Sequence, residues 1–222
     1  AVFFMVQAQR SQQAARTLLG GFTGQLVSDR YNAYKFYSWI RQICWAHLKR
    51  DFKALSEANG PLGKIGGQLH ELAQEILKLR KRVRDGTLRW ETFQHRMPAL
   101  QQRVESLLEA GAHFDGNLGG KCRDILEHRQ CLWTFVQDPK VEPTNNLAER
   151  IVRQAVLWRK GSFGTQSQRG ARYVERILTV CATCRLQGRS VIEYLRAACY
   201  CHLNGLPVPS LIESTGNVVK SA

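Results

Sequence analysis

Acidic residues are scarce in this chain: 18 Asp and Glu stand against 32 Lys and Arg, for a net charge of +14. No Asp or Glu precedes Asp29. No apolar run reaches the roughly 18 residues of a membrane span, and the start, Ala1 to Val6, lacks the basic lead and initial Met of a secretory signal. Seven scattered cysteines, an odd number, favour a reducing cytosol over a disulfide framework. We therefore expect a cytoplasmic protein without membrane segments, cut from something longer.

The positive charge is concentrated in two segments. Residues 1–55 carry eight Lys and Arg against two acids, and residues 147–189 carry nine against two. Residues 56–138 between them are nearly neutral, with twelve against eleven. Charge that served only solubility would be spread more evenly. The distribution favours a polyanionic partner, most simply DNA or RNA.

The first 55 residues alternate between strand and helix patterns. We expect strands over residues 1–8, 25–29 and 40–47, separated by a helix that Ser11 caps and by a helical turn over 31–37. This alternation predicts parallel strand pairing. Asp29 would then lie at the carboxyl end of a central strand, a favoured place for chemistry, although it would serve equally as the cap of the next helix.

Residues 56–138 read as an all-helical insertion. Amphipathic stripes run along residues 69–83, 93–108 and 122–136, with Pro98 marking a kink or a boundary in the second. The segment holds no catalytic motif. Its four histidines are spread too widely to indicate a metal site and are expected at the surface: His70, His95, His113 and His128.

A basic helix is predicted from Thr144 or Asn145 to a stop at Gly161. Glu149, Arg153 and Lys160 share one stripe of it at 100° per residue. An ordinary salt bridge one turn apart on a solvated face would explain the same pattern. Apolar residues on the remaining faces lead us to expect that a sheet covers one side of this helix and C-terminal helices cover the other.

The remaining chain continues with a loop, two helices and a tail. The glycine-rich, basic loop over 161–170 suits a phosphate. Helices are expected over 171–186 and from a capping box of Ser190 and Glu193 to Gly205, with a loose tail after Pro209. Helical geometry argues against a zinc site at the clustered cysteines, which are Cys181, Cys184, Cys199 and Cys201.

Four stretches together resemble the IS66-type transposases. They are Val-Ser-Asp-Arg-Tyr-Asn-Ala-Tyr at 27–34, Arg-Gln-Ile-Cys-Trp-Ala-His-Leu-Lys-Arg at 41–50, Asn-Asn-Leu-Ala-Glu-Arg at 145–150 with Arg159 and Lys160, and the Phe-Gly to Gly-Ala loop at 163–171. Each stretch is moderately specific and the combination is more so. The resemblance covers the chain from about Phe4 to Leu206.

The resemblance implies an α/β fold of the RNase H-like type, interrupted by a large helical insertion and followed by a helical C-terminal region. Residues 1–55 and 139–189 would form the two parts of the core, 56–138 the insertion, and 190–222 a C-terminal helix and tail. Such a core normally begins with a strand that carries a first acid. Because no acid precedes Asp29, the resemblance implies that the chain lacks this strand and begins within the third one.

The resemblance also assigns the site. Asp29 and Glu149 would be the second and third acids of a DDE set and would bind Mg²⁺ or Mn²⁺. Cys44, His47 and Asn146 would support them. The residues expected to bind DNA are Arg150, Arg153, Arg159, Lys160, Arg169 and Arg172.

The implied function is DNA transposition by metal-dependent strand cleavage and strand transfer, with this chain an incomplete catalytic region. Element ends and target DNA would be its partners, together with further copies of itself assembled on DNA and accessory proteins of the element. We expect a bacterial, nucleoid-associated protein. Two other readings stay open: a non-catalytic basic DNA- or RNA-binding module or degenerate remnant, and a nuclease relative with another substrate.

Overall fold

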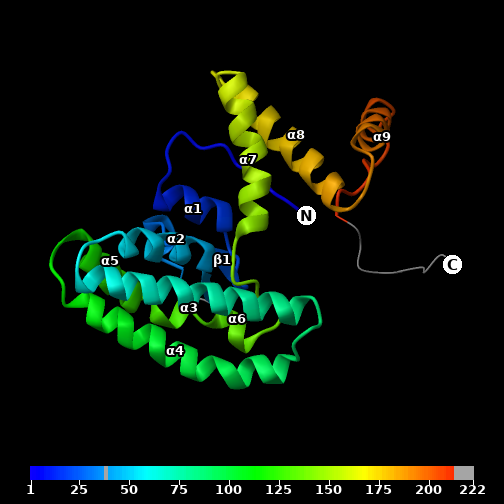
Figure 1. The fold of residues 1–222 in the computed structure, drawn as a ribbon. Coiled ribbons are helices and arrows are strands. Elements are labelled where there is room, and N and C mark those ends of the chain that lie inside the picture. The colour runs from blue at the N-terminus through cyan, green and yellow to red at the C-terminus, as the bar shows by residue number, and fades with distance from the viewer. Residues whose placement is uncertain (38–39, 213–222) are drawn as a thin grey trace. The chain divides into compact units, whose positions relative to one another are not determined.

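The computed structural model describes residues 1–37 and 40–212, so most of the tail predicted after Pro209 lies outside the described residues. The chain divides into two compact units, coloured along the sequence in Figure 1. We call Arg10–Glu149 the core unit. We call Ala1–Gln9 together with the chain from Arg150 onward the C-terminal unit.

The core unit begins with a helix and a small parallel sheet. Helix α1, Gln12–Leu19, is capped as predicted by Ser11, whose Oγ accepts the Ala14 N–H at 3.1 Å. Strands β1, Leu26–Ser28, and β2, Arg41–Ile43, pair in parallel with the 3-10 turn η1, Asn32–Tyr34, between them. The predicted parallel pairing is confirmed.

The strand predicted over 40–47 is wrong beyond Ile43, because helix α2, Trp45–Ser56, begins almost at once. Its buried residues Trp45, Leu48, Phe52 and Leu55 follow helical spacing, which outweighs the β propensity of the segment. Among the described residues the sheet has two strands and most of the chain is helical. The RNase H-like core therefore stays a prediction.

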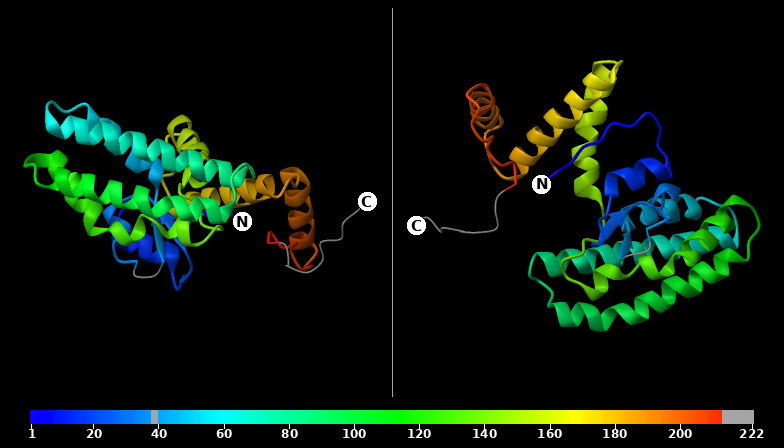
Figure 2. Two further views of the ribbon diagram at one scale, coloured as in Figure 1. Left: turned by 60° about the horizontal axis from the view of Figure 1, so that its bottom comes forward. Right: turned by 180° about the vertical axis from the view of Figure 1, so that it is seen from behind.

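The region predicted as an insertion is helical, and it packs within the core unit. Helices α3, Pro61–Arg84, and α4, Trp90–Ala112, run side by side in opposite directions (Figure 2). Pro98 lies inside α4 without ending it. The third predicted helix, over 122–136, is broken into α5, Gly116–Glu127, the 3-10 turn η2, Arg129–Cys131, and α6, Thr134–Gln137. Their inward faces form one apolar core with α2 and β2.

Helix α7, Asn146–Gly161, ends at the predicted residue and continues from the core unit into the C-terminal unit. It is followed by α8, Gln168–Leu186, and α9, Val191–Leu203. Ser167 caps α8, and Ser190 caps α9 by accepting the Glu193 N–H at 3.3 Å, which is one half of the predicted capping box.

The strand predicted over residues 1–8 is wrong. The segment is extended but pairs with no strand, and alternate N–H groups donate instead to side chains of α8: Val2 to Thr183 at 2.9 Å, Phe4 to Thr179 at 3.0 Å and Val6 to Glu175 at 2.7 Å. Two residues of extended chain advance about 6.6 Å, close to the roughly 6 Å of four helical residues. The matching repeats allow α8 to satisfy the donors that a sheet would otherwise pair.

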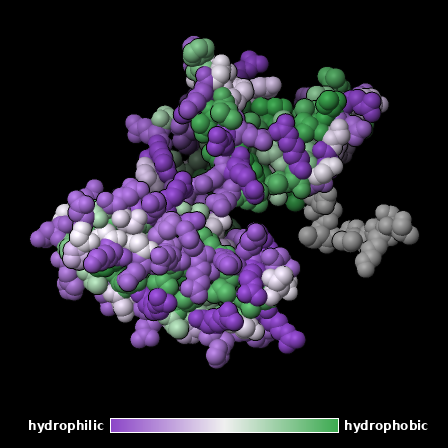
Figure 3. Space-filling view, viewed as in Figure 1, coloured by the Kyte–Doolittle hydropathy of each residue, from purple (hydrophilic) through white to green (hydrophobic). Residues whose placement is uncertain are grey.

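The C-terminal helices do not bury α7 as predicted, since none of its residues is buried. The predicted cover by a sheet stays a prediction. Leu157 is 57% exposed, and the expected sheet is reduced to two short strands in the described part of the chain. Apolar surface also gathers over α8 and α9 (Figure 3). The exposed apolar residues of α9 include Ile192 and Leu203. No helix within the described residues is both long and apolar enough to cross a bilayer.

Candidate functional site

Asp29 and Cys44 lie at the same edge of the small sheet. Asp29 directly follows β1 and Cys44 directly follows β2. The Cys44 N–H donates to the Ser28 carbonyl at 2.8 Å, which extends the parallel ladder by one bond. Because the strands are parallel, their carboxyl ends meet here, at the kind of edge where ligands bind in α/β folds.

The Asp29 carboxylate is held by local contacts and remains partly open. Its Oδ1 accepts the Tyr31 N–H at 3.1 Å, and its Oδ2 lies 3.2 Å from Nη2 of Arg10. Arg10 also stacks over the Tyr31 ring, with its Cζ 3.8 Å from the ring centroid. The Asp29 side chain is 25% exposed, so both its oxygens are fixed in direction while solvent still reaches the group.

A buried arginine supports the backbone under Asp29. Arg41 donates from Nη2 to the Asp29 carbonyl at 2.8 Å and from Nε to Ser28 Oγ at 3.0 Å. Burial lowers the pKa of Arg41, while the Asp29 carboxylate acts in the opposite direction. These hydrogen bonds set the bend by which the chain leaves β1, and so the direction of the Asp29 side chain.

Glu149 lies in the first turn of α7 and pairs with α2. Its Oε1 lies 3.0 Å from His47 Nε2 and 3.9 Å from Arg50 Nη2, and its side chain is 42% exposed. The other ring nitrogen of His47, Nδ1, is buried without a hydrogen-bond partner among the described residues. His47 therefore joins the two helices through the ring edge that faces Glu149.

Cys44 connects the sheet edge to the start of α7. It is fully buried, and its Sγ accepts the Asn145 N–H at 3.4 Å. The next residue, Trp45, donates its N–H to the Pro143 carbonyl at 2.8 Å. The ends of β1 and β2 and the starts of α2 and α7 thus share one corner, which we call the acid corner: Asp29, Cys44, His47, Asn145 and Glu149.

The contacts of the acid corner differ in part from those that the sequence predicted. Asn146, predicted to support the site, is exposed and lines a separate cavity of about 240 Å³ with Arg80 and Lys81. The neighbouring Asn145 makes the contact to Cys44. The sequence could have predicted that Arg50 lies near Glu149, because Arg50 follows His47 by three residues on the same helical face. Arg10 and Arg41 reach Asp29 through tertiary contacts that no spacing rule reveals.

A second acidic cluster lies on α5 and just beyond it. Ligand atoms of Asp124, Glu127 and His128 lie within 4.8 Å of one another, although the histidines were expected to be too spread for a metal site. Desolvation favours the neutral form of Asp124, but the hydrogen bond from Lys35 and the charges of Arg30 and Lys35 outweigh it and lower its pKa. Arg30 also pairs with Asp51 at 2.7 Å. The Asp124 charge is thus already compensated, which favours a structural network over a metal site.

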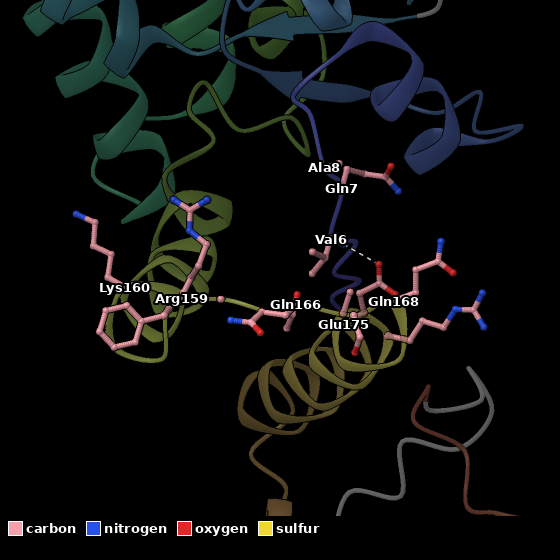
Figure 4. Close-up of a pocket in the computed structure, with 14 residues that line it drawn as sticks. Val6, Gln7, Ala8, Arg159, Lys160, Gln166, Gln168 and Glu175 are labelled. Atoms are coloured by element: carbon pink, nitrogen blue, oxygen red, sulfur yellow. Dashed lines mark hydrogen bonds between the residues drawn. The ribbon is translucent and has the colours of Figure 1, made fainter.

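The C-terminal unit contains a basic cleft of about 970 Å³ (Figure 4). Its walls are residues 6–8 of the N-terminal segment, the end of α7, the connecting loop and the first turns of α8. Of the six predicted DNA-binding residues, Arg159, Lys160 and Arg172 line this cleft. Arg150 and Arg153 lie earlier on α7 and Arg169 lies in the first turn of α8.

The loop at the cleft has an unusual backbone. Phe163 has φ of 57°, in the left-handed region that costs a non-glycine residue about 1–2 kcal/mol, and its side chain is 94% exposed. Gly164 follows with φ of 80°.

All seven cysteines are free, and in the described part of the chain none belongs to a metal-ligating group.

Comparisons with known proteins agree on one family. The sequence model of the family described as "Transposase IS66 family" matches residues 1–173. The uncharacterized protein y4qI of Sinorhizobium fredii is 29% identical over 199 residues, which cover 80% of this chain and 35% of that protein. The uncharacterized protein y4hP of the same organism is 23% identical over 214 residues, which cover 84% and 38%. The chain thus spans just over a third of these relatives, and no solved structure gives a significant match.

Proposed function

Because this chain belongs to the IS66 family of transposases, we propose that it supplies part of a metal-dependent site for DNA strand cleavage and strand transfer. Asp29 and Glu149 are the proposed catalytic acids. The observation that carries this assignment is the acid corner, where Cys44 and His47 tie the carboxyl edge of the sheet to the first turn of α7.

The carboxylates of Asp29 and Glu149 provide some of the ligands that Mg²⁺ or Mn²⁺ would need. Both ions prefer hard oxygen ligands, and both carboxylates are open enough to exchange a cationic neighbour for a metal. Asp29 and Glu149 do not form a three-ligand group within the described residues. Asp29 and Glu149 would supply two carboxylates of such a set, and the chain spans just over a third of the relatives that it matches.

Each residue of the corner has a separate proposed task. When bound, a divalent ion would activate the attacking oxygen and stabilise the leaving one. Asp29 and Glu149 would bind it. His47 holds the Glu149 carboxylate in one direction, and Arg41 holds the backbone at Asp29. Cys44, with its buried thiol, fixes the distance between sheet edge and α7 without entering the chemistry.

We assign DNA binding to the basic residues of α7, the loop and α8. Arg159, Lys160 and Arg172 would contact phosphates in the cleft. Arg150 and Arg153 on α7 and Arg169 on α8 would extend the contact. Element ends, target DNA, further copies of the protein and accessory proteins are the proposed partners of the whole protein. A location in the bacterial cytoplasm at the nucleoid follows from that proposal.

The DNA-binding assignment is tested by salt dependence. Replacing Arg159 and Lys160 together by Ala should weaken duplex binding for every sequence and flatten the log–log salt slope by about one unit per lost phosphate contact. The matched control replaces Arg96 and Arg103, exposed arginines on α4, and should leave the slope unchanged. Equal slopes for both double variants would contradict the assignment.

The alternative function is a basic DNA-binding module without catalysis. The observation in its favour is that both acids already have cationic neighbours, Arg10 at Asp29 and His47 at Glu149. In that case these ion pairs are structural, DNA binding needs no metal, and divalent cations leave Asp29 and Glu149 untouched.

A further inference from the structure

The loop between α7 and α8 presents an aromatic ring at the basic cleft. Phe163 lines the cleft together with Arg159 and Lys160, yet its side chain is 94% exposed. Within the described residues it forms no aromatic pair and no cation–π contact. Packing of the protein itself therefore gives no reason for a large apolar side chain at this position.

The backbone at Phe163 makes the choice of residue more unusual. A φ of 57° suits glycine or asparagine and is unfavourable for a bulky aromatic residue. Gly164 follows at φ of 80°, a conformation that glycine adopts without strain. Strain of this kind is concentrated where a side chain is needed for function.

The other groups of the cleft complete a nucleotide-binding set. Arg159, Lys160 and Arg172 supply cations for phosphates, and the amides of Gln166 and Gln168 offer both donors and acceptors for the edge of a base. An exposed ring provides a stacking surface. In a duplex the faces of the bases are covered by their neighbours, so an exposed ring stacks most readily on a base that is out of the stack.

We propose that the cleft binds an unpaired nucleotide of DNA, with Phe163 stacked on the base and Arg159, Lys160 and Arg172 on the flanking phosphates. This inference rests on the proposed DNA binding and specifies it: the preferred substrate has a frayed or single-stranded segment. The cleft volume of about 970 Å³ is sufficient for a nucleotide.

The test compares two DNA probes on the full chain. One is a blunt duplex, and the other is the same duplex with four unpaired nucleotides at one 3′ end. The wild type should bind the second about tenfold more tightly, as expected for stacking of one base. Phe163→Asn should remove this preference while keeping duplex affinity, because asparagine accepts the left-handed backbone and the fold is kept. Phe163→Tyr should retain the preference.

The control is Tyr173→Ala, which removes an exposed aromatic side chain of α8 that does not line the cleft. It should leave both affinities unchanged. The inference is overturned if the wild type binds both probes equally, or if Phe163→Asn keeps the preference. Equal binding that still depends on Arg159 and Lys160 would leave the proposed DNA binding intact, whereas absence of binding to both probes would overturn the two proposals together.

Discussion

At the scale of single residues, acids in this strongly basic chain are repeatedly found with cations. Asp29 pairs with Arg10, Asp51 with Arg30, and Asp124 with Arg30 and Lys35. Pairs in half-buried positions, such as those of Arg30, contribute to stability because losing one partner leaves a poorly solvated charge. The pair at Glu149 is more exposed, and exposed pairs contribute little to folding. This difference favours a structural role for Asp124 and a functional one for Glu149.

Asp124→Asn should lower the free energy of unfolding by about 1–2 kcal/mol at pH 7, because Arg30 loses one of its carboxylate partners. The pKa of Asp124 is lowered in the folded chain, so its contribution is present above the pKa of the unfolded chain. It is lost as the pH falls through the folded value. Denaturant unfolding at a series of pH values should therefore show that the free energies of unfolding of the two proteins converge as the pH falls below the ordinary range of carboxyl groups.

The control for this change is Asp115→Asn, an exposed acid at the start of α5 without a side-chain capping bond. It should alter stability by less than about 0.5 kcal/mol. A difference between wild type and Asp124→Asn that stays constant from neutral to acid pH would show that the charge of Asp124 is not the cause.

Sequence patterns predicted the local positions of Asp29 and Glu149 better than the contacts of these residues. Asp29 and Glu149 stand in recognisable stretches, and their local positions, after a strand and in the first turn of a helix, are as expected. Arg10 is nineteen residues from Asp29, and Asn145 lies 101 residues from Cys44. Contacts of this range depend on the tertiary fold, which residue spacing does not encode.

At the scale of elements, the core unit depends on the close approach of α2 and α3. A Cβ added to Gly66 on α3 would lie 2.4 Å from the Ser56 backbone nitrogen and 2.5 Å from the Leu55 carbonyl carbon. Neither atom belongs to a flexible side chain, so the helices would have to separate. The adjacent Gly67 has nothing within 4 Å of such a Cβ.

Gly66 and Gly67 give opposite predictions for substitution by alanine. Gly66→Ala should destabilise the chain by about 2–3 kcal/mol through overpacking. Gly67→Ala should stabilise it by about 0.5–1 kcal/mol, because alanine loses less conformational entropy in a helix. Thermal unfolding of the two variants measures both effects. If both substitutions shift the midpoint in the same direction, α2 and α3 do not approach as closely as described.

Helices were more predictable than strands. Amphipathic spacing and capping residues located α1, α4, α7, α8 and α9 to within about four residues, because the signal repeats over several turns. The stripe at 69–83 found only the later part of α3, which begins at Pro61. The apolar run at residues 1–8 carries no such period, and its length alone suggested a buried strand. Its actual partner is the side-chain ladder of α8, which appears only when the distant helix is placed beside it.

At the scale of the whole molecule, charge and compact units correspond only in part. The basic segment 147–189 lies almost entirely in the C-terminal unit, and most of the basic segment 1–55 lies in the core unit. The polyanionic partner that these segments indicate stays a prediction. The helical character of 56–138 followed from periodicity, but its packing against the sheet within one unit did not.

The central claim, a divalent metal held by Asp29 and Glu149, is tested most directly by titrating the full chain with Mn²⁺ and following free Mn²⁺ by electron paramagnetic resonance. Asp29→Asn and Glu149→Gln should each weaken binding by about tenfold or more, since each removes a hard, charged ligand. Asp124→Asn should leave it unchanged, because Arg30 and Lys35 already compensate that carboxylate. Mn²⁺ binding that is lost in Asp124→Asn but kept in both other variants, or no Mn²⁺ binding by the wild type, would contradict the claim.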